Sequence, residues 1–306
     1  MERQHMAIGN RQPRRKLRMG QKWIPYLFIS PFFIAFIIFT LGPTIYSLRL
    51  SFSEWYGVGP IKYIGLDNFI EIAKSPYIMK SFRNVLIIAA YNITIPLVLA
   101  LIVALMMNSK LTKYPVFSRA VLFSPGTLSA VFSVLMFRMI LNTRFGLLNN
   151  FLSNLGIPPL DWLGSTTLAL PSVLIIMTWA SLGGGMVFFL AGLQSIPREY
   201  YEIASIDGAN AWRSFLNVTL PFLRPMIIYL VTTGMIGCFS TFSEPFLLTR
   251  GGPLGATYTP AMAVYQYGFV DGRMGFGSAI AYVIALATFI AAFFLFKYVK
   301  FFKEGD

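Results

Sequence analysis

The sequence has little of the chemistry on which most metal sites and enzymes depend. Its 306 residues include one cysteine, Cys238, and one histidine, His5. A single cysteine excludes an internal disulfide and a cysteine-based metal site, and a histidine in the tail excludes a histidine site or proton relay in the core. A Gly-x4-Gly-Lys-Ser/Thr phosphate-binding pattern is also absent, as is any nucleophile and base constellation.

Charged residues are scarce as well, at 12% of the chain against roughly a quarter in a typical soluble domain. Hydrophobic residues make up 56%, and they gather in runs of about 20 residues, the length of helix that crosses a bilayer. The runs are continuously apolar and do not alternate, so they indicate helices and not a barrel. We therefore predict an all-α, polytopic membrane protein with six transmembrane helices at about 24–48, 84–107, 120–141, 168–192, 224–246 and 276–299.

The positive charges predict the orientation of these spans. Of 25 lysines and arginines, 16 lie in the N-terminal tail, in the loops 108–119 and 193–224, and at the C-terminal end. Lysine and arginine concentrate in cytoplasmic loops, so both termini are expected to be cytoplasmic. Residues 1–23 then form a basic cytoplasmic tail, residues 24–306 form the transmembrane domain, and the net charge of +13 indicates topology and not nucleic-acid binding.

The two longer outer segments show turn signals and short apolar stretches. Segment 49–83 contains several glycines and predicts a folded loop with a short helix from about Asp67. Segment 247–275 begins with the turn Arg250-Gly251-Gly252-Pro253 and continues as a surface helix or a shallow re-entrant piece.

The most informative stretch lies between the fourth and fifth spans. It reads Glu202-Ile203-Ala204-Ser205-Ile206-Asp207-Gly208-Ala209, and nine residues after Gly208 comes Val218-Thr219-Leu220-Pro221. Ser195 is predicted to cap a helix that runs to Asp207 and stops at Gly208 in the left-handed conformation. Tyr201, Ala204, Ser205 and Gly208 would share one face, and its small residues suit insertion into a groove on a partner.

This spacing resembles the cytoplasmic loop of ATP-binding-cassette importer permeases, which runs Glu-Ala-Ala, three residues, Gly, nine residues, Ile-x-Leu-Pro. Ile203 and Val218 depart from the pattern but keep its bulk and polarity. Three further segments are similar to the carbohydrate-importer branch, in particular to the first of its two permease subunits, the maltose-permease type: Ser30-Pro31-Phe32, Gly65-Leu66-Asp67-Asn68-Phe69 and Leu247-Leu248-Thr249-Arg250-Gly251-Gly252-Pro253.

The resemblance implies a type I importer permease fold and a transport subunit that is not itself an enzyme. It implies import of a sugar by alternating access, with a second homologous permease as heterodimer partner, two cytoplasmic ATPase subunits that bind ATP and Mg²⁺, and an extracytoplasmic solute-binding protein. No cofactor belongs to this chain, which would lie in a bacterial or archaeal cytoplasmic membrane. The loop 193–223 would dock on the ATPase, with coupling residues Glu199, Glu202, Ala204, Asp207, Gly208, Leu220 and Pro221.

Polar groups inside spans are costly, so they are candidates for the substrate path. The fourth and fifth spans offer hydroxyl groups, an acid and an aromatic ring, which suit a sugar. The resemblance places five residues where the maltose-permease family lines its sugar site: Met177, Ala180, Ser181, Gly184 and Thr241. The candidate substrate-path residues are Met177, Trp179, Ser181, Gly184, Ser240, Thr241 and Glu244. Alternatively, the hydroxyls bond their own helix backbone and the glycines allow close helix packing.

A second reading is an ion-coupled secondary carrier of small polar solutes. Such a carrier needs buried ionisable groups, and only Glu244 and Arg138 are candidates within the predicted spans. The sequence shows no internal repeat of the kind that builds many such carriers. The importer reading is therefore preferred.

Overall fold

The computed structural model describes residues 23–109 and 113–303, in two units, residues 1–49 and 50–306. The predicted basic tail up to Lys22, with His5, falls outside the described residues. In the first unit, α1 (Ile24–Phe36), the π-helix η2 (Ile37–Leu41) and α2 (Gly42–Ser51) form one 28-residue helix that is long and apolar enough to cross a membrane. The widened π turn ends two residues before Pro43, whose ring nitrogen cannot donate the usual backbone bond.

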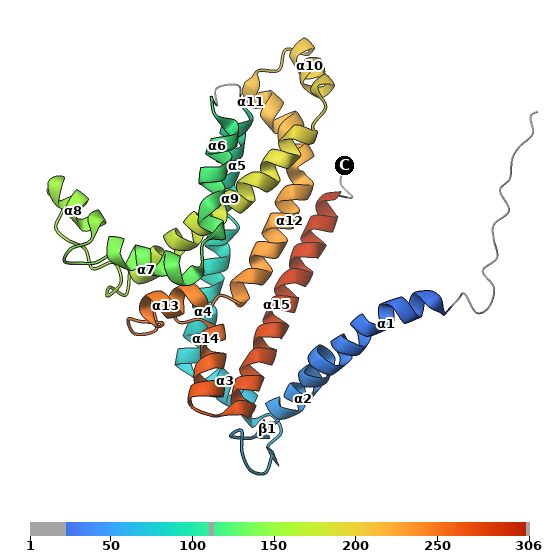
Figure 1. Cartoon of the computed structure of the whole chain (residues 1–306), viewed down its shortest axis with the longest axis vertical. Helices are drawn as coiled ribbons and strands as arrows, with labels where there is room; N and C mark the ends of the chain where they lie inside the picture. The colour runs from blue at the N-terminus through green and yellow to red at the C-terminus, as the bar shows by residue number, and fades with distance from the viewer. Residues whose placement is uncertain (1–22, 110–112, 304–306) are drawn as a thin grey trace, which may run out of the picture. The chain divides into compact units, whose positions relative to one another are not determined.

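The second unit is built around long helices that run along its length (Figure 1). They are α4 (Pro76–Asn92), α5 (Ile95–Asn108), α9 (Ala169–Ser195), α12 (Leu220–Phe239) and α15 (Met274–Lys303). A turn at Ile93–Thr94 separates α4 from α5, and together they pass the length and composition test as one span. Among the described residues, five helices could cross a membrane, or six if a bent pair forms one span.

The bent pair corrects the third predicted span. Residues 120–141 do not form a straight helix: α6 (Pro115–Phe123) and the 3-10 turn η3 (Ser124–Thr127) meet α7 (Ala130–Ile140) at 97°. Pro125 and Gly126 lie in that turn, where a missing amide donor and a permissive backbone favour a break.

The fifth predicted span, 224–246, is also wrong at both ends. Its helix already begins with α11 (Ala211–Ser214) and the π-helix η4 (Phe215–Thr219), which continue into α12. It ends at Phe239, and a separate short helix, α13 (Ser243–Thr249), follows.

Short elements occupy the end of the second unit opposite α10 (Figure 1). Strands β1 (Ser53–Glu54) and β2 (Lys62–Tyr63) pair antiparallel, and α3 (Asp67–Lys74) begins where the sequence predicts a short helix. The apolar stretch in segment 247–275 forms α14 (Pro260–Tyr265) and the π-helix η5 (Gln266–Val270). Between α7 and α9 lies α8 (Leu147–Asn154).

An ion pair links α3 to the start of α15. Arg273 donates two hydrogen bonds to the Glu71 carboxylate, at 2.8 and 2.7 Å, and its guanidinium lies 4.3 Å from the centre of the Phe276 ring. These hydrogen bonds lower the pKa of Glu71, although partial burial opposes the shift.

The glycines of α9 have different packing environments. A Cβ at Gly183 would lie 2.3 Å from the Leu122 carbonyl oxygen, and one at Gly185 would lie 2.9 Å from the Ala100 Cβ. A Cβ at Gly184 would meet nothing within 4 Å. Two of the three glycines therefore allow α9 to approach α5 and α6 closely, as the packing interpretation expects.

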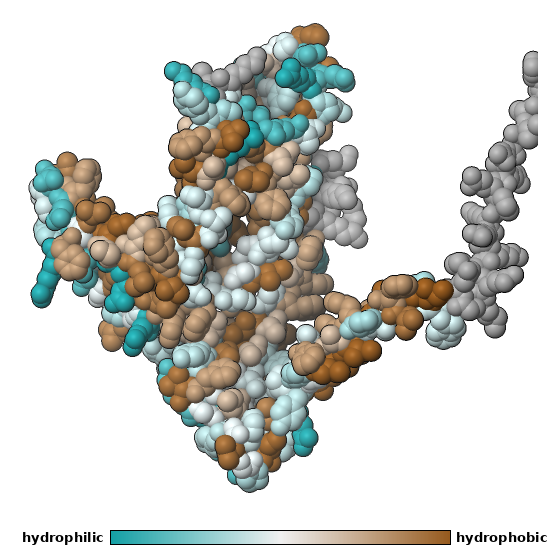
Figure 2. All heavy atoms as spheres, viewed as in Figure 1, coloured by the Kyte–Doolittle hydropathy of each residue, from teal (hydrophilic) through white to brown (hydrophobic). Residues whose placement is uncertain are grey.

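Apolar residues cover much of the long helices in Figure 2, and hydrophilic residues gather at the end that carries α10. Large side chains such as Leu86, Ile175, Phe188 and Phe293 are exposed on these helices. Water would penalise so much contiguous apolar surface, whereas lipid tails would not.

Candidate functional site

Helix α10 (Arg198–Ile206) occupies the centre of the loop between α9 and α12. It begins after Pro197, and no side chain caps its first turn. The predicted Ser195 cap is wrong, because Ser195 is the last residue of α9 and its hydroxyl donates to the Gly192 carbonyl at 2.7 Å. Pro197 supplies the helix start, since its fixed φ suits the entry to a helix and it has no amide to satisfy.

The end of α10 agrees with the prediction. Gly208 has a φ of +75°, in the left-handed region. Its amide donates to the Ser205 carbonyl at 3.1 Å, and the Ala209 amide donates to the Ala204 carbonyl at 2.9 Å. This pair of bonds is the Schellman motif, which satisfies the last carbonyls of a helix and sets the direction of the following chain.

One face of α10 packs on its own chain. The Tyr201 hydroxyl lies 2.9 Å from the Thr219 hydroxyl at the start of α12, and Tyr201 and Ala204 pack against a core cluster that includes Leu193 and Val218. The insertion of this face into a partner's groove stays a prediction. Tyr201 and Ala204 attach α10 to α12, because an aromatic ring and a small residue allow close packing there.

The opposite surface of α10 is exposed and mixed in chemistry. Glu199, Glu202 and Asp207 are exposed, together with two large apolar side chains, Ile203 and Ile206, the second 84% exposed. Exposed large apolar groups beside acids are typical of docking surfaces.

Other parts of the loop lie beside α10. Trp212 on α11 is 66% exposed, while Leu220 is half-buried and Pro221 is exposed at the start of α12. The sequence reading missed Ile206 and Trp212, although their apolar character in a polar loop was a usable signal.

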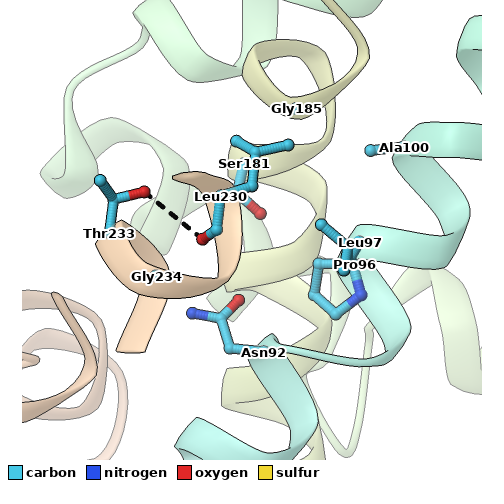
Figure 3. A pocket seen from close by; sticks show the side chains of 9 residues that line it. All are labelled: Asn92, Pro96, Leu97, Ala100, Ser181, Gly185, Leu230, Thr233 and Gly234. Carbon is cyan, nitrogen blue, oxygen red and sulfur yellow. Dashed lines mark hydrogen bonds between the residues drawn. The ribbon is translucent and has the colours of Figure 1, made fainter. Parts of the chain in front are cut away.

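A cavity of about 170 Å³ lies among four helices (Figure 3). Three polar side chains line it: Asn92 at the end of α4, Ser181 on α9 and Thr233 on α12. The other lining residues are Pro96, Leu97, Ala100, Gly185, Leu230 and Gly234.

The polar groups of the cavity are partly engaged. Ser181 donates to the Thr178 carbonyl at 3.3 Å and Thr233 to the Tyr229 carbonyl at 2.8 Å, as the backbone-bonding alternative expects. Asn92 donates one amide proton to the Cys238 sulfur at 3.3 Å. Each hydroxyl keeps acceptor capacity, and an amide carries two donors and an acceptor, so the cavity can hydrogen-bond a polar solute.

The seven predicted substrate-path residues do not come together. Ser181 alone lines the cavity, and Gly184 is its near neighbour on α9. Met177 packs into apolar clusters, and the Trp179 ring lies 5.2 Å from the Phe137 ring. Asn92 and Thr233 were missed, although an asparagine inside an apolar run was visible in the sequence.

The remaining three lie beyond the fifth span. Ser240 and Thr241 follow the end of α12, and the Thr241 carbonyl accepts a hydrogen bond from Thr259 at 2.7 Å. Glu244 lies half-buried in the first turn of α13, so its placement inside a span is wrong. Helix α12 ends at Phe239, and residues 240–242 belong to no helix.

The long apolar helices, a polar cavity among them and a structured polar loop at one end define a membrane transport protein. The chain belongs to the family described as binding-protein-dependent transport system inner membrane component, whose model matches residues 22–299. It is therefore a transport subunit and not an enzyme.

Similar proteins cover nearly the whole chain. The arabinooligosaccharides transport system permease protein AraP of Bacillus subtilis is 32% identical over 95% of this chain and 93% of its own. The trehalose/maltose transport system permease protein MalF of Thermococcus litoralis is 30% identical over 87% and 90%. A crystal structure of a bacterial ABC transporter involved in the import of alginate contains a chain with the same fold, with a TM-score of 0.82 at 23% identity over 92% and 96%.

Proposed function

We propose that this chain is a permease subunit of an ATP-driven sugar importer that receives its substrate from a solute-binding protein. The observation that carries the proposal is the attachment of α10 to α12, through the Tyr201 and Thr219 hydroxyls 2.9 Å apart. Helix α12 also contributes Leu230 and Thr233 to the lining of the cavity among the long helices. A displacement of α10 by a partner would thus be passed to a wall of the cavity.

The exposed side of α10 supports docking on a separate ATPase. Ile203 and Ile206 offer apolar area. Glu199 offers negative charge in the first turn, where the helix dipole favours acids, and Glu202 adds a second charge one turn later. In this proposal ATP and Mg²⁺ bind two ATPase subunits on the cytoplasmic side. A second, homologous permease completes a heterodimer, and the solute-binding protein delivers substrate from outside.

The proposed topology follows from the position of α10. The loop with α10 and both termini would be cytoplasmic, and β1, α3 and α14 would face outward in a bacterial or archaeal cytoplasmic membrane. The positive residues of loop 193–224 support this orientation.

The choice of a sugar as substrate has two supports. Relatives about 30% identical over most of the chain are named for transport of arabinooligosaccharides and of trehalose and maltose. The cavity presents an amide and two hydroxyls beside apolar walls, which suits a solute with both hydroxyl groups and apolar ring faces.

The test is reconstitution of the assembled complex in liposomes with its solute-binding protein. ATP hydrolysis and uptake of radiolabelled maltose, trehalose, lactose and arabinotriose are measured together. We expect at least one of these sugars to stimulate both, only when the binding protein is present. ATP-independent uptake that follows an ion gradient would contradict the proposal and favour a secondary carrier.

A further inference from the structure

A second pair of cavities adjoins α13. One cavity, of about 180 Å³, lies between α7 and α13, and the other, of about 370 Å³, lies between α13 and the segment α14–η5. Both are lined by Phe246 and Arg250, so they meet at these two residues. Neither cavity shares a lining residue with the cavity among the long helices.

Two arginines line this pair of cavities. Arg138 lies in the last turn of α7 and Arg250 follows the end of α13; both are exposed. Arg250 has a φ of +51°, which is uncommon for a residue other than glycine, and its amide bonds to the Phe246 carbonyl at 3.1 Å. A conformation of this kind persists where the surroundings hold it, so the backbone that carries the guanidinium is well defined.

The other lining groups include aromatic rings and an amide. The Tyr265 ring lies 5.3 Å from the Phe246 ring at 72°, and the buried Tyr258 lies beside them. Burial raises the pKa of Tyr258, so its hydroxyl stays neutral. Gln266 donates to Asp271 at 2.9 Å and leaves its other amide groups for a ligand.

The charged side chains that line these two cavities are all positive. Among the described residues, no carboxylate lines either one. The acids nearest in the chain are Asp271, which is bonded to Gln266, and Glu244, which lies on α13 outside both linings. Two arginines among apolar and aromatic lining residues favour a ligand that carries an oxyanion, because arginine binds carboxylates through paired hydrogen bonds.

We propose that the two cavities form one subsite for the acidic unit of a saccharide, with a uronate carboxylate held by Arg138 and Arg250. The ring of that sugar would lie against Phe246 and Tyr265, since aromatic faces pack on the apolar faces of sugars. The inference rests on the proposed sugar importer and adds saccharides with an acidic unit to its expected substrates. A phospholipid headgroup carries the same oxyanion chemistry, so the test separates the two sources.

The first experiment measures binding of trigalacturonate and of neutral maltotriose to the assembled complex in phosphatidylcholine nanodiscs, without the binding protein. We expect trigalacturonate to bind and maltotriose to bind much more weakly. Arg138→Gln and Arg250→Gln should each weaken trigalacturonate binding by about tenfold, the usual size of one lost charge-assisted bond. Arg250→Lys keeps the charge and should lose less, while Arg144→Gln, an exposed arginine outside both cavities, should match wild type.

Equal binding of the two trisaccharides, or trigalacturonate binding unchanged in both glutamine variants, would overturn the subsite. The second arm repeats thermal unfolding in nanodiscs with and without phosphatidylglycerol. If the glutamine variants lose only a stabilisation by phosphatidylglycerol, the arginines bind lipid and the proposal is wrong. The importer is judged separately: ATP hydrolysis stimulated by maltotriose with no trigalacturonate binding would leave the importer standing and remove this subsite.

Discussion

Replacing Gly208 tests the role of the end of α10. A Cβ at this position would meet nothing within 4 Å, so a side chain causes no collision, and the residue is exposed, so no buried area changes. The cost comes from the backbone alone, because φ is +75°. For an L-residue this conformation costs about 1–2 kcal/mol, and a β-branched side chain lies at the upper end. Gly208→Val should therefore reduce the population of correctly oriented α10 by roughly 5–30-fold.

The assay is substrate-stimulated ATP hydrolysis by the complete complex in liposomes. Gly208→Val should retain basal hydrolysis and assembly but lose most of the stimulation, with Gly208→Ala intermediate. Gly208→Asn is the matched control, since asparagine tolerates the left-handed region best after glycine. If Gly208→Val shows full stimulation, the orientation of α10 does not couple hydrolysis to transport.

Three further predictions concern the long helices and the end of the unit that carries α3. Gly183→Ala should lower the unfolding free energy by about 1–3 kcal/mol, because the added methyl meets the Leu122 backbone. Gly184→Ala should be neutral or stabilising, because the space around Gly184 is open. Thermal unfolding in detergent compares the two variants. Asn92→Leu should leave assembly intact and slow sugar uptake by at least ~fivefold, since it removes the amide that lines the cavity. The lowered pKa of Glu71 means that its ionised form stabilises the fold above its ordinary pKa and that this contribution is lost as pH falls through the lowered value. Glu71→Gln should thus reduce the melting temperature near neutral pH, with the difference from wild type shrinking below pH ~4, and a constant difference would contradict the assignment.

The sequence was sufficient for the features that depend on local patterns. Apolar runs located the first, second, fourth and sixth spans, because length and composition alone decide whether a helix can cross a membrane. The left-handed Gly208 followed from the rule that helices end at glycine. The short helix from Asp67 followed from the turn residues before it.

The wrong predictions concern features that depend on tertiary contacts: the shape of a span, the start of a helix and the lining of a cavity. Hydropathy does not distinguish a straight span from one bent at Pro125 and Gly126, because both halves are apolar. Ser195 favours a cap in isolation, but α9 continues through it. The cavity joins Asn92 and Thr233, which lie far apart in the sequence, so no local pattern brings them together.

The most direct test of the account is a photo-crosslinking amino acid placed at Ile206, the most exposed apolar residue of α10, in the complex assembled in cells. The account predicts a covalent adduct with the cytoplasmic ATPase subunit. The same amino acid at Val58, in the segment between β1 and β2 and also highly exposed, should give no such adduct, because that end would face outward. An adduct of the ATPase with position 58, or of the solute-binding protein with position 206, would contradict both the orientation and the coupling role of α10.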